Sequence, residues 1–285
     1  MDTGALIGKP ERLESKKPDG STETYDVKTL TECLERLCFV TKRKLTDISF
    51  AIYVTVVQNT EAYLQKFLNS FLTSDKFIEV GYGNVPLRTL VPHPGADRIV
   101  TAIAAEKKHG SDNEPLLVID FGTATTLDVV ERENDVIFIT GGTIAIGPIT
   151  MKAGFDRAVP ALANKYELKK TERVVSRNVF EQTSAGAYYG YLGLVCRLID
   201  DTVKELVADR RLVSPDSLNL VLTGGPSVIF QEDIEAEYSN NDLVSFKASD
   251  YELMMEGLFI IYKYNMLLRE HEAKRQVKKK ELSKL

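Results

Sequence analysis

Residues 116–126 read Leu-Leu-Val-Ile-Asp-Phe-Gly-Thr-Ala-Thr-Thr and constrain the fold more than any other stretch of this 285-residue chain. The apolar start predicts a buried strand that ends at Asp120, followed by a turn through Gly122 and Thr123. Open α/β sheets bind ligands just beyond the carboxyl ends of such strands. There a glycine lets a backbone N–H approach a phosphate, a threonine adds a donor, and a carboxylate can hold a cation. The alternative is a hairpin between two core strands, with Asp120 as an ordinary turn residue.

A second candidate segment lies upstream, where residues 94–105 read Pro-Gly-Ala-Asp-Arg-Ile-Val-Thr-Ala-Ile-Ala-Ala. Ile99, Ala102 and Ile103 recur at helical spacing and predict a helix that begins near Asp97. The first turn of a helix favours anions, so Asp97 and Arg98 lie where an anionic ligand could bind. The simpler interpretation is that Asp97 caps the helix and that Arg98 is a solvated neighbour.

Composition argues against several classes of function. A net charge of −5 and a hydrophobic content of 44% are ordinary for a globular protein of one or two domains. Duplex nucleic-acid binders carry a strong basic face, so no nucleic-acid partner is expected. Residues 1–13 lack the apolar core of a signal peptide and no run reaches the length of a membrane span, so we expect a cytoplasmic protein without a membrane partner. Cys33, Cys38 and Cys196 lack metal-ligand spacing and are expected to be free thiols.

Periodicity gives a coarse map of alternating helices and strands. Helices are expected over 25–39, 61–71, from Asp97 onward, 149–162, 181–207 and 251–268. Strands are expected over 47–57, 77–80, 87–91, 116–120, 127–130, 136–140 and 218–222. The second half therefore reads as a three-stranded meander followed by helices and a further strand, and the first half shows a weaker version of the same order. This map predicts an α/β protein.

Several short strings, in this order, resemble one known family. They are Gly95 to Val100, Asp120 to Val130, Gly141 to Ala145, Ser184-Ala185-Gly186 with Tyr189-Gly190-Tyr191, and Thr223-Gly224-Gly225. Together they closely resemble the type III pantothenate kinases of the actin-like, sugar-kinase-like ATPase superfamily. The resemblance implies two ribonuclease-H-like domains, 1–114 and 115–285, with a nucleotide cleft between them and a basic tail at the end of the second.

The resemblance also implies an activity, the ATP-dependent phosphorylation of pantothenate to 4'-phosphopantothenate, which is the first step of coenzyme A biosynthesis. Family members use ATP with Mg²⁺ and a monovalent cation, K⁺ or NH₄⁺, and are homodimers whose pantothenate pocket is completed across the interface. Helices 149–162 and 181–207 are the expected interface, and packing of these helices against the chain's own sheet is the alternative.

The family's site residues carry over onto the matching positions of this sequence. Asp97 is the expected general base, and Asp120 is expected to bind the monovalent cation. Pantothenate is expected at Gly95, Ala96, Asp97, Arg98 and Val179, and ATP at Asp2, Gly4, Gly122, Thr123, Thr223, Gly224 and Gly225.

Two departures from the family pattern affect that expectation. Family members begin with an apolar strand that runs into Asp-x-Gly-Asn-Thr, whereas here Asp2 and Gly4 are followed by Ala5 and Leu6 and no strand precedes them. The start is then misassigned, the gene truncated, or this first phosphate loop lost. Val179 stands where the family has a threonine hydroxyl on pantothenate. Alternatives are therefore a catalytically impaired homologue that acts as a binding or regulatory protein, and a kinase for a different small alcohol.

Overall fold

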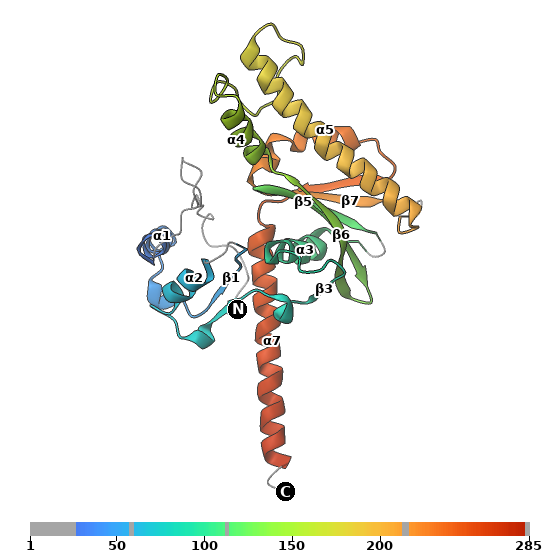
Figure 1. Ribbon diagram of the computed structural model, residues 1–285. Coiled ribbons are helices and arrows are strands. Elements are labelled where there is room, and N and C mark those ends of the chain that lie inside the picture. Colours follow the sequence, from blue (N-terminus) through green and yellow to red (C-terminus); the bar gives the residue numbers. More distant parts are fainter. Residues whose placement is uncertain (1–26, 57–59, 112–113, 213–216, 283–285) are drawn as a thin grey trace. The chain divides into compact units, whose positions relative to one another are not determined.

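The structure is a computed structural model that describes residues 27–56, 60–111, 114–212 and 217–282 (Figure 1). The chain forms two compact units, and it passes between them several times. The first comprises residues 1–85, 95–97 and 258–285, and the second comprises 86–94 and 98–257.

The second unit is built on a six-stranded sheet. Its strands in spatial order are β3 (Leu87–Thr89), β6 (Val136–Ile146), β5 (Ala124–Glu133), β4 (Leu116–Phe121), β7 (Leu218–Thr223) and β8 (Val244–Ser249). β4, β5 and β6 form an antiparallel meander, and β7 and β8 extend the sheet parallel to β4. A meander followed by parallel strands that return through helices is the arrangement expected of a ribonuclease-H-like domain, and the predicted α/β class is confirmed.

Helices cover both faces of this sheet (Figure 1). On one face, α5 (Val179–Ala208) and α6 (Gln231–Tyr238) pack against alternate residues of β4, β5 and β7, which form the main hydrophobic core. The other face carries α3 (Ala96–His109), in which residues 99–106 are all buried. Because both faces are covered, β4 and β7 are almost continuously apolar, which is typical of central strands. α4 (Pro148–Ala158) follows β6 directly.

The first unit is smaller. α1 (Val27–Val40) and α2 (Thr60–Leu68) accompany a two-stranded parallel sheet of β1 (Ala51–Tyr53) and β2 (Phe77–Glu79). α7 (Leu253–Leu282) joins this unit from Leu258 onward, where Tyr262 contacts the ring of Phe50 and Asn265 donates to the carbonyl of Asn84. Among the residues that the structure describes, 3₁₀ turns lie in this unit at Leu45–Asp47, Ser74–Lys76 and Tyr82–Asn84, and in the second unit at Gly225–Ile229.

Most expected elements are present with shifted bounds. β1 is shorter than its predicted strand, whereas β5, β6 and α7 are longer, and α6 and β8 were not predicted. The division at residues 114 and 115 and a second ribonuclease-H-like domain in the first half stay predictions. All three cysteines are free thiols, as expected. Throughout the described ranges, none of the helices has the length and apolar character that crossing a membrane requires.

Candidate active site

Two adjacent strand ends bring most of the expected phosphate-side residues together in the second unit. β4 and β7 run parallel, and Asp120 is the register partner of Thr223. The two strands therefore deliver Asp120 and the Thr223–Gly225 turn to the same sheet edge. Asp120 is partly exposed there, while Thr223 is buried and Gly225 is exposed. This is the edge at which α/β sheets place ligands.

Gly224 allows a close approach of two backbone segments at this edge. Its φ is 84°, a left-handed conformation that strongly favours glycine. A Cβ added at this position would lie 2.5 Å from Asp120 Oδ1 and 2.5 Å from the carbonyl oxygen of Phe121. The 3₁₀ turn that follows is held by Ser227, whose backbone N–H and hydroxyl both donate to the Gly224 carbonyl. The Gly224 backbone is thereby fixed against the Asp120 carboxylate.

The turn between β4 and β5 presents Thr123 to solvent. Gly122 donates its backbone N–H to the carbonyl of Ala124, which tightens the turn. From the start of α4, the Gly147 N–H and the Thr150 hydroxyl both donate to the Thr123 carbonyl, at 3.1 and 2.7 Å. The Thr123 carbonyl is thus occupied by structural hydrogen bonds, and its exposed side chain is left on the outer side of the turn.

A buried tyrosine of α5 supports the same turn from inside the protein. The hydroxyls of Tyr191 and Thr125 are 2.5 Å apart, and Tyr191 also donates to the carbonyl of Ile146. Burial raises the pKa of Tyr191, although its bond to Thr125 opposes the shift, so the hydroxyl stays protonated. Sequence patterns indicate Tyr191 only as part of a family string, and they do not indicate Thr150 or Ser227. Their contacts depend on tertiary packing, which local patterns do not report.

The start of α3 carries the expected base. A Cβ added at Gly95 would lie 2.5 Å from Asp97 Oδ1, so the Asp97 carboxylate folds back over the backbone just before the helix. Ala96 begins the helix and is partly exposed. Arg98 does not project into solvent as the simpler interpretation held, because its side chain is 11% exposed and forms an ion pair with Asp128 of β5.

The remaining expected residues fall at two other places. Val179 is the first residue of α5 and is 49% exposed. It follows Asn178, which caps the helix by accepting from the backbone N–H groups of Phe180 and Glu181. Asp2 and Gly4 lie outside the described residues.

The site offers oxygen donors for a cation but no preformed cage. Among the described residues, no group of three His, Cys, Asp or Glu side chains is placed to hold a metal ion. At Asp120 the carboxylate and the carbonyl oxygen of Phe121 both lie close to Gly224, and both are hard oxygen ligands. Such a set fits an alkali or alkaline-earth cation that completes its coordination with water or phosphate oxygens, and it does not fit a tetrahedral zinc site.

Comparison with known proteins identifies the family. The sequence model described as Type III pantothenate kinase matches residues 7–201. Curated proteins named type III pantothenate kinase are similar to the chain over 61%, 76% and 60% of its length. They come from Acidobacterium capsulatum (34% identical), Pelobacter propionicus (30%) and Geobacter sulfurreducens (33%), and the matches span 62%, 78% and 58% of those proteins.

Similarity to solved structures is much weaker. MreB5 of Spiroplasma citri has a TM-score of 0.44 and 12% identity over 84% of this chain and 75% of that one, which is too distant to decide the fold. Membership follows instead from the family model, which spans more than half of the chain, and from the Pelobacter relative, most of whose length is matched. The chain belongs to the type III pantothenate kinase family.

Proposed function

We propose that this protein transfers the γ-phosphoryl group of ATP to pantothenate, the first step of coenzyme A biosynthesis. Membership in the family supports the activity. The observation that carries the proposal is the shared sheet edge, where Asp120, the Gly122–Thr123 turn and Gly224 lie together. A glycine-lined turn with a hydroxyl and a carboxylate suits a nucleotide polyphosphate with its cation.

The phosphate side of the reaction falls to the second unit. Gly122 and Thr123 would contact the phosphates, because their turn is exposed and braced from behind. Thr223, Gly224 and Gly225 would line the nucleoside side, where small residues let a flat base lie against backbone. Asp2 and Gly4 would belong to the first phosphate loop.

The acceptor side falls to residues 95–98, with Asp97 as the general base. Phosphoryl transfer needs an oriented acceptor hydroxyl and a group that receives its proton. Asp97 is a carboxylate at the start of α3. Because Gly95 has no Cβ, the Asp97 carboxylate can lie close to the backbone at residue 95. Gly95, Ala96 and Val179 complete the proposed pantothenate residues, with Arg98 adjoining them at the start of α3.

Two cations accompany the reaction in this proposal. Mg²⁺ would enter with ATP, since it is usually held by one or two carboxylates and substrate phosphates. K⁺ or NH₄⁺ would bind at Asp120, where a carboxylate and backbone carbonyls provide oxygen ligands. When bound, these cations would neutralise charge on the transferring phosphates. We place the reaction in the cytoplasm, where ATP is available.

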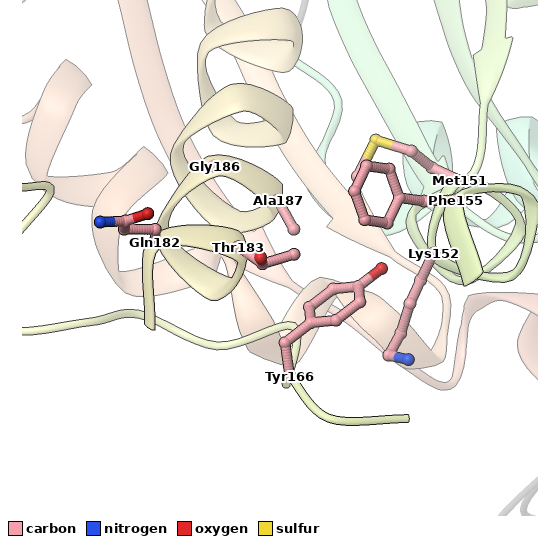
Figure 2. Close-up of a pocket in the computed structure, with 8 residues that line it drawn as sticks. All are labelled: Met151, Lys152, Phe155, Tyr166, Gln182, Thr183, Gly186 and Ala187. Atoms are coloured by element: carbon pink, nitrogen blue, oxygen red, sulfur yellow. The ribbon is translucent and has the colours of Figure 1, made fainter. Parts of the chain in front are cut away.

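We also propose a homodimer formed through α4 and α5. These helices border an apolar cavity of about 350 Å³, and Figure 2 shows Met151 and Phe155 on one side of it and Gly186 and Ala187 on the other. Ile149, near the start of α4, is 51% exposed. Small residues on α5 would let a second helix approach closely.

A second candidate function is that of a binding or regulatory protein with little turnover. Val179 favours it, because the family's threonine hydroxyl is replaced by a methyl at an exposed helix start. The change removes a hydrogen bond to the acceptor, and such a bond contributes about 1 kcal/mol.

The first test is ATP consumption by the purified chain with pantothenate, Mg²⁺ and K⁺, beside Asp97→Asn. We expect pantothenate-dependent turnover that falls by about 100-fold or more in Asp97→Asn, since a general base typically contributes that much. ATP binding by Asp97→Asn, measured by calorimetry, should be unchanged. A folded, dimeric wild-type protein without turnover would instead support the binding or regulatory role.

A further inference from the structure

Two ion pairs with buried carboxylates and partly exposed arginines join α3 to β5, one near each end of the helix. Near the start, Arg98 pairs with Asp128, and near the end Glu106 pairs with Arg132. Asp128 and Glu106 are each only 3% exposed, so each carboxylate needs a cationic partner to remain charged inside the protein. Both pairs lie within the second unit.

The spacing of the pairs shows that α3 runs alongside β5 in the same direction. Eight helical residues from Arg98 to Glu106 rise about 12 Å, at 1.5 Å per residue. Four strand residues from Asp128 to Arg132 span about 14 Å, at 3.4 Å per residue. The two lengths agree, so both pairs can form at once without bending either element.

Arg98 and Glu106 carry charges opposite to those that their own ends of α3 favour, although Asp97 in the first turn and Lys107 to His109 in the last turn follow the helix preference. A helix start stabilises anions and a helix end stabilises cations. Arg98 is in the first turn and Glu106 is near the last, so helix electrostatics explains neither residue. Their partners on β5 explain both residues. The helix has a cation and then an anion, and the strand has an anion and then a cation, so all four charges pair in only one direction and one register of the helix on the strand.

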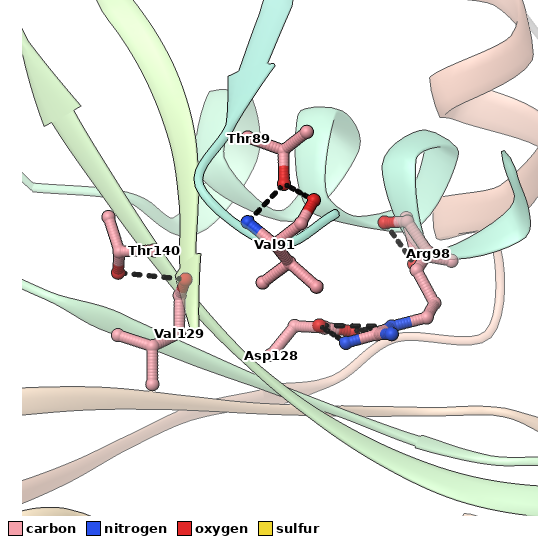
Figure 3. Close-up of polar contacts among 7 residues, drawn as sticks. Thr89, Val91, Arg98, Asp128, Val129 and Thr140 are labelled. Carbon is pink, nitrogen blue, oxygen red and sulfur yellow. Dashed lines mark hydrogen bonds and ion pairs between the residues drawn. The ribbon is translucent and has the colours of Figure 1, made fainter. Parts of the chain in front are cut away.

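The ion pair near the start of α3, between Arg98 and Asp128, is formed by several hydrogen bonds (Figure 3). The Arg98 Nε lies 3.1 and 3.0 Å from the two Asp128 oxygens, and Nη2 also donates to Oδ1, so the contact is forked. Gly142, opposite Asp128 on β6, leaves room for it. A Cβ at Gly142 would lie 2.3 Å from the carbonyl oxygen of Leu127, 3.1 Å from Asp128 Oδ1 and 3.3 Å from Arg98 Nη2, so the glycine serves the strand backbone first and the ion pair second.

We propose that Arg98 is a positioning residue, which holds the first turn of α3 on Asp128 and so fixes the backbone of the adjoining base Asp97. The first turn is where a helix frays, because its N–H groups have no partner within the helix. A forked ion pair one residue after Asp97 limits that fraying where the base is attached. The proposal rests on the proposed function, and it assigns Asp128 to the same task.

Matched isosteric changes separate this role from general stability. Asp128→Asn neutralises the pair beside Asp97, and Glu106→Gln neutralises the pair at the other end of the same helix. We expect both to lower the melting temperature. Asp128→Asn should lower kcat about tenfold or more with the KM for pantothenate changed less than threefold, because misplacing a reacting group chiefly costs rate. Glu106→Gln should leave kcat within twofold.

Arg98→Ala distinguishes positioning from direct binding of substrate. If Arg98 acts through Asp128, Arg98→Ala should reproduce the Asp128→Asn kinetics, and the double variant should be no worse than either alone. The proposal is overturned if Arg98→Ala raises KM tenfold with kcat retained, or if Asp128→Asn keeps kcat within twofold of wild type. Should Asp128→Asn fail to fold, Arg98→Lys, which keeps the charge and loses the fork, should show the same fall in kcat.

Hydrogen exchange tests the positioning without reference to catalysis. In Asp128→Asn, amides of residues 98–102 should exchange about tenfold faster than in Glu106→Gln, because the start of the helix opens locally. Equal exchange in the two variants would overturn the proposal. If the wild-type chain proves inactive, this readout still decides the role of Arg98, whereas the Asp97→Asn assay alone decides the proposed function.

Discussion

Gly224 has a φ of 84°, a backbone conformation that residues with a side chain rarely adopt. A Cβ added there would also lie 2.5 Å from Asp120 Oδ1. Gly224→Ala should therefore destabilise the protein by about 1 kcal/mol or more, because a Cβ both strains this backbone and displaces the carboxylate. Nucleotide affinity should fall with it. Thermal unfolding and calorimetric titration with ATP measure the two effects.

Gly193→Ala is the matched control. Gly193 lies on an exposed position of α5, and a Cβ added there meets nothing within 4 Å. Alanine favours a helix interior by about 0.5–1 kcal/mol over glycine, so this variant should be slightly more stable and bind ATP normally. If Gly224→Ala behaved like Gly193→Ala, the close contact with Asp120 would have no part in the site.

The residue pattern predicted some of these contacts and not others. An apolar run that ends at Asp120 and another that ends at Thr223 predict two strand ends, and parallel pairing then joins them. Arg98 was expected on pantothenate or in solvent, and its bond to Asp128 could not be foreseen. The two residues are 30 positions apart, and only the packing of α3 on β5 brings them together.

Helices and strands are tied together at a second charged cluster, where α3 ends beside the connection from β8 to α7. Asp250 lies 2.9 Å from His109 Nε2 and 2.8 Å from Lys108 Nζ, and Lys108 also pairs with Glu256. Burial alone would raise the pKa of Asp250, but the bonds from Lys108 and His109 outweigh it and lower that pKa below its usual value of 3.8. The ionised form thus stabilises the fold.

Asp250→Asn should lower stability at pH 7 by about 2 kcal/mol, the size expected for charged hydrogen bonds. Because the pKa is lower in the folded than in the unfolded state, the stabilisation is complete above pH 4 and is lost as the pH falls below it. The difference in melting temperature between variant and wild type should therefore shrink between pH 7 and pH 3. Asp201→Asn, which removes exposed ion pairs on α5, should change little at either pH.

If the difference in melting temperature between Asp250→Asn and wild type were the same at pH 3 and pH 7, the charge of Asp250 would not be the stabilising factor.

The contacts of Asp250 lie next to β8, an element that the sequence did not predict. β8 reads Val-Ser-Phe-Lys-Ala-Ser, a short edge strand with weak alternation, and α6 is a two-turn helix rich in acidic residues. Both form because β7 and α5 offer them partners, and tertiary packing overrides weak local preference.

At the scale of the whole molecule, the sequence predicts elements with strong local patterns and does not predict contacts between distant segments. The central strands of the second unit are buried on both faces, and their uninterrupted apolar runs made them readable. The first unit takes residues from three separate stretches of the chain, an arrangement that no local pattern reports. Contacts between two copies of the chain are even harder to predict from local sequence patterns, because they depend on which apolar side chains stay exposed after folding.

Exposed apolar side chains on α4 and α5 make the proposed homodimer testable by one substitution. Ile149→Glu places a charge at a position 51% exposed in the single chain, where it costs the folded monomer little. In a dimer formed through these helices, the same charge would be buried without a partner. We expect sedimentation equilibrium to show a dimer for the wild type and a monomer for Ile149→Glu at micromolar concentration. Phe39→Glu, on α1 at a position 85% exposed, should remain dimeric. A dimer that survives Ile149→Glu but not Phe39→Glu would move the interface to the first unit.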